Sequence, residues 1–106
     1  MNYRYMRVII FFDLPVLTAQ NRREYRAFRK MLIKAGFMMM QESVYCKLAQ
    51  NSSGADAIVE NVKKNKPSSG LVQAIRITEK QYSKMDFIVG QGYKDVLDTD
   101  ERLVIL

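Results

Sequence analysis

One aspartate and a group of basic residues are the side chains of this sequence whose types and spacing point to chemistry. Asp13 follows the apolar run 8–12 and precedes Leu14 and Pro15. Mg²⁺ takes one or two carboxylates from a protein and keeps several waters. Residues 22–34 then carry six cations, which Glu24 alone opposes within that segment: Arg22, Arg23, Arg26, Arg29, Lys30 and Lys34. A lone acid followed by many cations predicts a polyanionic partner and a divalent cation such as Mg²⁺.

The positive charge of the chain is unevenly distributed. The formal net charge is +6, and the segment up to Ser53 has nine basic and three acidic residues, whereas the remainder has eight of each. The excess therefore lies in the N-terminal half and favours a nucleic-acid ligand for it. The alternative is that the cations form a solvated helix face or pair with the acidic segment 95–101.

The composition excludes several kinds of site. Histidine is absent, which removes the usual general base near neutral pH and histidine-based triads and zinc sites. Cys46 is the single cysteine, so an intrachain disulfide is impossible, and we expect a core residue in a reducing compartment. The short apolar run 8–12 is neither a secretory signal nor a membrane span, and a cytoplasmic location is expected.

The elements that must position these residues follow from apolar periodicity. Residues 8–12 predict a central strand that Pro15 closes. Thr18 and Asn21 are candidate N-caps of a helix that runs to about Ala35 and ends at Gly36. At helical spacing the apolar residues of this helix share one arc, and its cations occupy the opposite arc. One face of the helix should pack on a sheet while the other meets water or a ligand.

The rest of the chain alternates between strand and helix patterns. Residues 37–48 predict one long strand, or two short strands hinged near 41–43. The three methionines 38–40 are interpreted as core or interface packing. Further along we expect a loop at 51–54, a helix over 55–65, a strand over 71–78, a polar connector at 78–82, a short strand over 85–89, a turn at 90–92 and an apolar tail at 103–106.

The hinge decides the fold. A single strand at 37–48 gives β-α-β-α-β, whereas two strands give β-α-β-β-α-β, the ferredoxin-like order. We favour the second, an α+β fold with both helices on one face of an antiparallel sheet and the other face free for a partner. The chain 1–106 is then one domain, and residues 95–106 form a tail that pairs with its own sheet or completes that of a second protomer.

Four segments together resemble a known family. They are FFDLP at 11–15, NRREYRAF at 21–28, KAGFMMMQESVYCKL at 34–48 and ITEKQY at 77–82. In this order and spacing, over nearly the whole chain, the sequence resembles the small CRISPR-associated proteins of the Cas2 family. The resemblance implies a ferredoxin-like homodimer whose two sheets face each other. It also implies a central position between copies of the Cas1 integrase during spacer acquisition, with duplex DNA as partner.

The same resemblance assigns a role to Asp13. In the Cas2 family the aspartate at the end of the first strand is associated with a divalent metal and, in some members, with nuclease activity. Many relatives have tyrosine before it, whereas this chain has Phe12. Two Asp13 side chains across a dimer axis would form one Mg²⁺ site. The simpler alternative is an aspartate that bonds backbone amides of the turn near Pro15.

Two functions are expected on this basis, and a small-molecule sensor with the same fold is a third alternative. The first is a homodimeric, DNA-binding structural subunit of the CRISPR adaptation complex, with phosphate contacts from Arg22, Arg23, Arg26 and Lys30. The second is a metal-dependent endonuclease that cleaves DNA or RNA through Asp13. A small-molecule sensor of the same fold would show no salt-dependent DNA binding.

Overall fold

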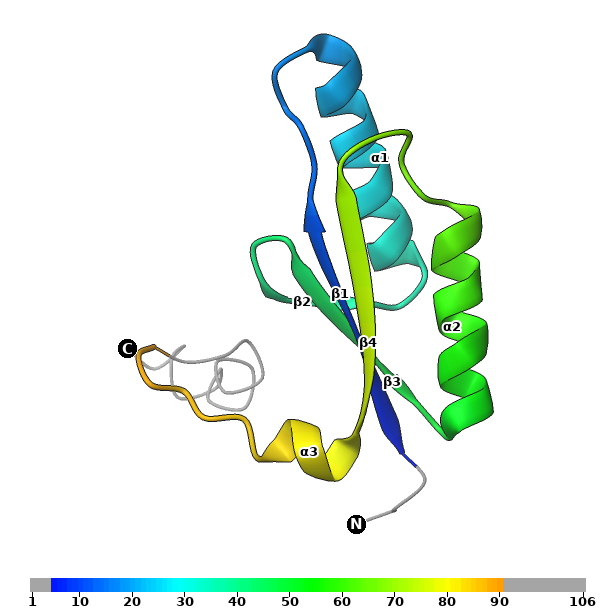
Figure 1. Ribbon diagram of the computed structural model, residues 1–106, viewed down its shortest axis with the longest axis vertical. Helices are drawn as coiled ribbons and strands as arrows, with labels where there is room; N and C mark the ends of the chain where they lie inside the picture. The colour runs from blue at the N-terminus through cyan, green and yellow to red at the C-terminus, as the bar shows by residue number, and fades with distance from the viewer. Residues whose placement is uncertain (1–4, 91–106) are drawn as a thin grey trace, which may run out of the picture.

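The computed structural model describes residues 5–90 of the 106-residue chain. Its elements are β1 (Met6–Asp13), α1 (Ala19–Lys34), β2 (Met38–Gln41), β3 (Val44–Ala49), α2 (Ser52–Lys64), β4 (Leu71–Thr78) and α3 (Glu79–Ser83). The strands form a four-stranded sheet in the order β2-β3-β1-β4 (Figure 1). Every neighbouring pair is antiparallel. This arrangement confirms the predicted α+β, ferredoxin-like fold.

The hinge between β2 and β3 is confirmed. Ser43 adopts a φ of 66°, in the left-handed region that non-glycine residues rarely occupy. Its carbonyl accepts a 3.0 Å hydrogen bond from the backbone amide of Phe12. The chain therefore reverses at this turn, next to the end of β1, and residues 37–48 make two strands instead of one.

Helix α1 begins and ends where its sequence predicts. The Thr18 hydroxyl accepts a 3.0 Å bond from the Asn21 amide, and the Asn21 side chain accepts a 3.3 Å bond from the Thr18 amide. This reciprocal pair satisfies two groups of the first turn. Gly36 follows the last turn with a φ of 96°, a conformation that favours glycine. Asn21 is thus a partner of the N-cap Thr18 and is not itself the cap.

Helix α2 begins three residues before its predicted start at Ala55, at Ser52. The side chain of Asn51 accepts a 2.8 Å bond from the Gly54 amide and acts as the N-cap. The predicted loop 51–54 is therefore mostly the first turn of the helix. Asparagine and serine favour both loops and helix starts, which explains the error.

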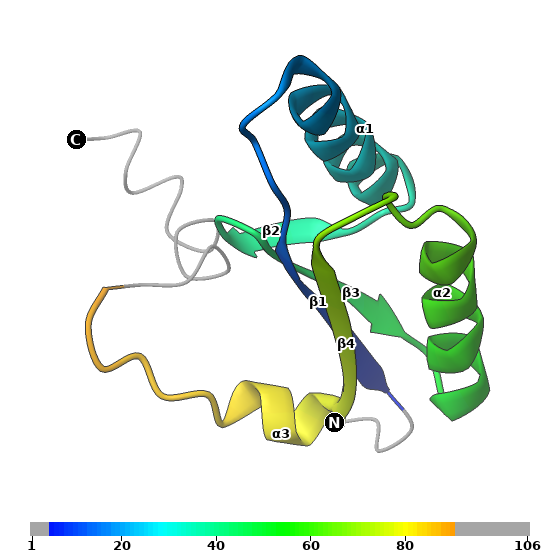
Figure 2. The same cartoon turned by 45° about the horizontal axis from the view of Figure 1, so that its top comes forward.

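The core lies between the sheet and the two long helices, which cover the same face (Figure 2). It consists of Val8, Ile10, Phe12, Leu14, Phe28, Leu32, Phe37, Tyr45, Ala49, Ala55, Val59 and Val62. Phe12 is central, because its ring packs against Tyr25, Phe28 and Tyr45 at centroid distances of 6.0, 5.2 and 5.7 Å. Cys46 is buried, as predicted, but it lies on the other face of the sheet.

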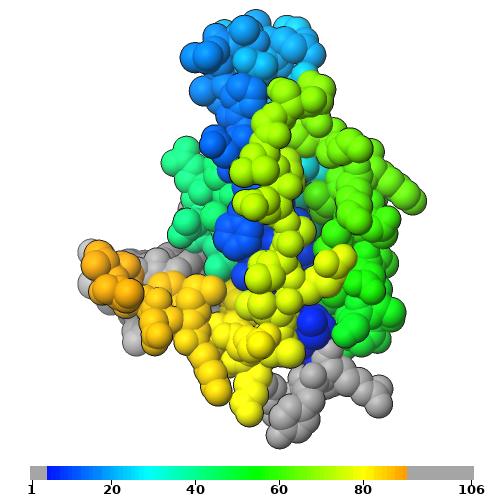
Figure 3. Space-filling model, viewed as in Figure 1, coloured from blue at the N-terminus to red at the C-terminus, as the bar shows by residue number. Residues whose placement is uncertain are grey.

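The second face of the sheet carries no long helix in the described part of the chain. The alternation of the strands directs to it a set of exposed apolar side chains: Phe11, Met38, Leu48, Leu71 and Ile75. The space-filling view shows β1 atoms between β4 and the β2–β3 hairpin (Figure 3). We call this side the open face. Exposed apolar patches of this kind mark interaction surfaces.

Two predictions near the end of β4 are wrong. The polar connector at 78–82 is the short helix α3, capped by the Thr78 hydroxyl, which accepts from the Gln81 amide. Residues 85–89 form no strand, because a strand needs a neighbouring edge, and among residues 5–90 no strand pairs with this segment. Most of the predicted turn at 90–92 and the whole tail 95–106 lie outside the described residues.

No helix among the described residues has both the length and the apolar character needed to cross a membrane. This agrees with the sequence, in which no apolar run approaches the roughly 20 residues of a spanning helix.

Replacing Leu32 by alanine should destabilise the protein by about 2–5 kcal/mol. Leu32 has no solvent exposure at the centre of the α1–sheet contact, so its truncation leaves a cavity. Urea unfolding followed by circular dichroism measures the change. Ile33→Ala is the matched control, because Ile33 is 52% exposed and should change stability by less than about 0.5 kcal/mol. Equal losses in the two variants would contradict the placement of α1.

Candidate nucleic-acid interface and metal-binding carboxylate

Asp13 is the last residue of β1, and its side chain is exposed. It pairs in register with Leu71 and shares the open face with Phe11, two residues earlier. Gly70, with a φ of 93°, allows β4 to begin beside it: a Cβ there would lie 2.9 Å from the Asp13 carbonyl oxygen. Among residues 5–90, no hydrogen bond or ion pair occupies the Asp13 carboxylate. The interpretation as a turn-forming aspartate therefore has no support in these contacts.

One chain alone offers an incomplete metal site. No group of three or more histidine, cysteine, aspartate or glutamate side chains gathers within the described part of the chain. Mg²⁺ accepts one or two carboxylates if water fills its other positions. The exposed Asp13 carboxylate supplies one such ligand, and a second copy of the chain would supply the other.

The four predicted phosphate-binding residues are all exposed on α1: Arg22, Arg23, Arg26 and Lys30. The ion pairs found within residues 5–90 join Arg7 to Glu79, Lys63 to Glu60 and Arg76 to Asp56. None of them includes one of the four. These four cations therefore form no ion pair with a carboxylate among residues 5–90, which leaves them accessible to a polyanion.

Hydrogen bonds divide these four residues into two pairs. Arg22 donates from Nη1 to the carbonyl oxygens of Val16 and Leu17 at 3.1 and 3.2 Å. Arg23 donates to Gln20 at 2.8 Å. Arg26 and Lys30 have no such bonds to the described residues. Arg22 thus holds the β1–α1 loop and must leave these carbonyls to contact a phosphate with the same nitrogen, whereas Arg26 and Lys30 need no rearrangement.

Asp13 and the basic residues do not form one cluster. Asp13 points to the open face, whereas α1 covers the opposite face of the sheet (Figure 2). The β1–α1 loop connects them, but no hydrogen bond or ion pair joins Asp13 to a described cation. Sequence proximity therefore overstated their association, because the loop after β1 carries the chain from Asp13 to a helix over the opposite face of the sheet.

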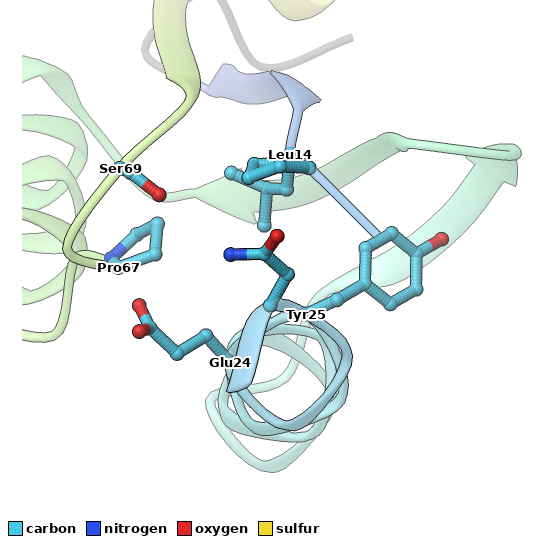
Figure 4. A pocket seen from close by; sticks show the side chains of 7 residues that line it. Leu14, Glu24, Tyr25, Pro67 and Ser69 are labelled. Atoms are coloured by element: carbon cyan, nitrogen blue, oxygen red, sulfur yellow. The ribbon is translucent and has the colours of Figure 1, made fainter. Parts of the chain in front are cut away.

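Glu24 has a structural role that sequence reasoning missed. Its carboxylate accepts from the hydroxyl and the amide of Ser68 at 2.7 and 2.8 Å, and from Gln20 at 3.0 Å. The close view shows Glu24 directed from α1 toward the turn that contains Pro67 and Ser69 (Figure 4). The Ser68 hydroxyl, the Ser68 amide and Gln20, in that order, lower the pKa of Glu24. Glu24 therefore ties α1 to the α2–β4 connection and forms no ion pair with its basic neighbours among the described residues.

The fold and these surfaces define a small ferredoxin-like protein with a basic helix and a lone carboxylate at a strand end. A family model described as "CRISPR associated protein Cas2" matches residues 6–85. The chain belongs to this CRISPR-associated Cas2 family, as its sequence resemblance predicted.

Curated relatives extend the match to nearly the whole chain. A protein of Treponema denticola is 56% identical over 95% of this chain and 100% of its own length. Proteins of Ligilactobacillus salivarius and Streptococcus mutans are 46% and 42% identical over 95% of this chain and 100% and 93% of theirs. Each of the three is named "CRISPR-associated endoribonuclease Cas2".

Glu24→Gln should remove part of the stability of the protein at neutral pH and little of it in acid. The folded pKa of Glu24 lies below its ordinary value of 4.5. Its contribution is therefore complete above the ordinary value and is lost as the pH falls through the folded pKa. Urea midpoints of wild type and variant, measured across this range, should converge toward low pH. Ser68→Ala should behave similarly, because it removes the hydroxyl donor, whereas parallel pH profiles for wild type and Glu24→Gln would contradict the assignment.

Proposed function

We propose that this chain is the homodimeric, duplex-DNA-binding subunit of a CRISPR adaptation complex and acts with the Cas1 integrase in spacer acquisition. The observation that carries the proposal is the exposure of Arg22, Arg23, Arg26 and Lys30 on α1, where none of them forms an ion pair with a described carboxylate. Membership of the Cas2 family supplies the CRISPR context. Experiments must test whether the chain binds DNA and whether it binds Cas1.

The open face supports the homodimer. Three apolar side chains project from this face into solvent: Phe11 is 39% exposed, Leu71 is 54% exposed and Ile75 is 46% exposed. Beyond α3, Ile88 and Val89 are each 92% exposed. A second copy that applies its own open face would remove this apolar area from water at roughly 25 cal/mol per Å². Facing sheets would leave the two α1 helices on the outer surfaces of the dimer.

A duplex would then contact α1 through its phosphates. Arg23, Arg26 and Lys30 lie on the exposed side of the helix, and two protomers double them. Such contacts position a duplex without reading its sequence. With about three contacts per protomer, log K should fall against log salt with a slope near −5.

Arg26→Gln should weaken duplex binding and flatten the salt dependence. The dimer loses one phosphate contact per protomer, so the slope should change by about 2. Fluorescence anisotropy of a labelled duplex across a salt series measures both quantities. Lys64→Gln, an exposed residue in the last turn of α2, is the charge-matched control and should leave the slope unchanged. Equal slopes for wild type and Arg26→Gln would remove α1 from the binding surface, and a wild-type slope near zero would remove DNA from the proposal.

A metal-dependent endonuclease is the second candidate, and the names of the relatives favour it, because those proteins are called endoribonucleases. Asp13 of each protomer would hold the ion. A bound Mg²⁺ would lower the pKa of a water and neutralise phosphate charge. In facing protomers Asp13 points toward the interface, whereas the basic face of α1 points outward. This separation favours the structural subunit over cleavage of the DNA that α1 holds.

Asp13→Asn separates these two functions. The structural subunit requires duplex affinity and spacer acquisition in cells to persist, because Asp13 lies away from α1 and its carboxylate supports no described contact. The endonuclease requires Mg²⁺-dependent cleavage of RNA or DNA to disappear, together with acquisition if cleavage serves it. We expect acquisition to persist within about twofold of wild type. Loss of acquisition with normal folding and normal DNA affinity would favour the enzyme.

A further inference from the structure

Tyr45 connects the core of the sheet to the basic helix α1. It lies on β3, in register with Ile10 of β1 and Met39 of β2. Its side chain is 1% exposed, and its ring stacks on that of Phe12 at a centroid distance of 5.7 Å. Its hydroxyl oxygen accepts a 2.8 Å hydrogen bond from Nε of Arg29, on α1. A buried residue of the sheet therefore contacts a cation of the helix through one defined bond.

The tyrosine side of this bond is rigid. β3 is paired on both sides, so the backbone of Tyr45 is held between two strands. The close packing of the core opposes any rotation of its ring. A buried tyrosine hydroxyl usually has a hydrogen-bond partner, and here Arg29 supplies it. The hydroxyl thus stands at a fixed point beside α1 and fixes the position of the Arg29 Nε atom.

Arg29 is exposed although its Nε atom is bonded to Tyr45. It shares one row of the helix surface with Arg22 and Arg26, because residues three and four positions apart are neighbours on a helix. Arginine has five N–H donors, and Nε supplies one of them. A planar guanidinium binds phosphate with paired donors. Arg29 therefore extends the row of Arg22 and Arg26 toward β3.

The bond to Tyr45 distinguishes Arg29 from the four residues of the proposed phosphate contacts. Arg22 bonds to loop carbonyls through Nη1, and Arg26 and Lys30 form no hydrogen bond to the described residues. A long side chain that becomes ordered only when its ligand binds loses conformational freedom at that moment. The Arg29 guanidinium is oriented already, because its Nε is fixed by a buried group.

We infer that Arg29 is a further phosphate contact of α1 and that Tyr45 is its positioning residue. The inference rests on the proposed binding of a duplex and adds two residues to it. Tyr45 is buried and touches no nucleic acid itself, so it acts through Arg29 alone. Its hydroxyl orients the guanidinium in the free protein, which lowers the conformational cost of the phosphate contact. This gives the buried tyrosine of the segment 34–48 a role in binding as well as in packing.

Two single variants test the two halves of the inference by fluorescence anisotropy of a labelled duplex across a salt series. Arg29→Gln should change the slope of log K against log salt by about 2, since the dimer loses one phosphate contact per protomer. Tyr45→Phe keeps the ring and the charge of Arg29, so affinity should fall by about fivefold with an unchanged slope. Tyr25→Phe is the matched control, because Tyr25 also packs on Phe12 but its hydroxyl forms no hydrogen bond with the described residues.

The double variant Tyr45→Phe with Arg29→Gln separates positioning from packing. If Tyr45 acts through Arg29, loss of its hydroxyl should not weaken binding further once Arg29 is replaced. An equal loss of affinity in both backgrounds would overturn the positioning role. Arg29→Lys keeps the charge but lacks the Nε donor and the planar group, so it should reproduce the weaker affinity and the unchanged slope of Tyr45→Phe.

The outcomes separate this inference from the proposed function. A wild-type chain without salt-dependent duplex binding overturns both. Wild-type binding that Arg29→Gln leaves unchanged in affinity and slope overturns the inference and leaves the other cations of α1 as the phosphate contacts. Circular dichroism checks that each variant is folded. If Tyr45→Phe is unfolded, Arg29→Lys decides, because Arg29 is on the exposed surface of α1, and wild-type affinity in that variant overturns the positioning role.

Discussion

The two-sided packing of β1 is the constraint on which the rest of the structure depends. β1 pairs with β3 on one side and β4 on the other, so its backbone is bonded along its length. Alternation then sends Val8, Ile10 and Phe12 into the core under the helices. The intervening positions, including Arg7 and Asp13, reach the open face. A shift of one residue would bury the charges of Arg7 and Asp13 and expose the core residues, so the register is strongly specified.

This alternation separates the two kinds of function that the sequence places side by side. The cations of α1 lie over the core face, whereas the Asp13 carboxylate faces the other way. If two chains associate through their open faces, both Asp13 side chains face the interface and the basic helices remain outside. A metal at Asp13 would then serve the interface, and α1 would remain available to a duplex. The proposed structural subunit and the proposed nuclease would therefore use different surfaces, which single substitutions can separate.

The features that could be predicted from the sequence are those that a few neighbouring residues determine. The strand at 8–12, the Thr18 cap, Gly36 after α1 and the hinge near Ser43 all follow from a few adjacent residues, and the structure confirms them. The Glu24–Ser68 and Arg7–Glu79 bonds join residues 44 and 72 positions apart, so no window of the sequence contains them. Arg22 was predicted as a phosphate contact because its charge is visible in the sequence, but its bonds to Val16 and Leu17 depend on the path of a loop.

The failed strand at 85–89 is informative about assembly. Its sequence, Met-Asp-Phe-Ile-Val, has the composition of a strand, yet β-propensity reflects packing against a neighbouring edge more than an intrinsic backbone preference. Among residues 5–90 no strand pairs with this segment, so it has no such edge. The strand pattern and the unpaired conformation are then consistent if the missing neighbour belongs to another molecule. The same association would cover the open face, to which Asp13 also points, so one interface would account for the exposed apolar side chains and for the unpaired segment.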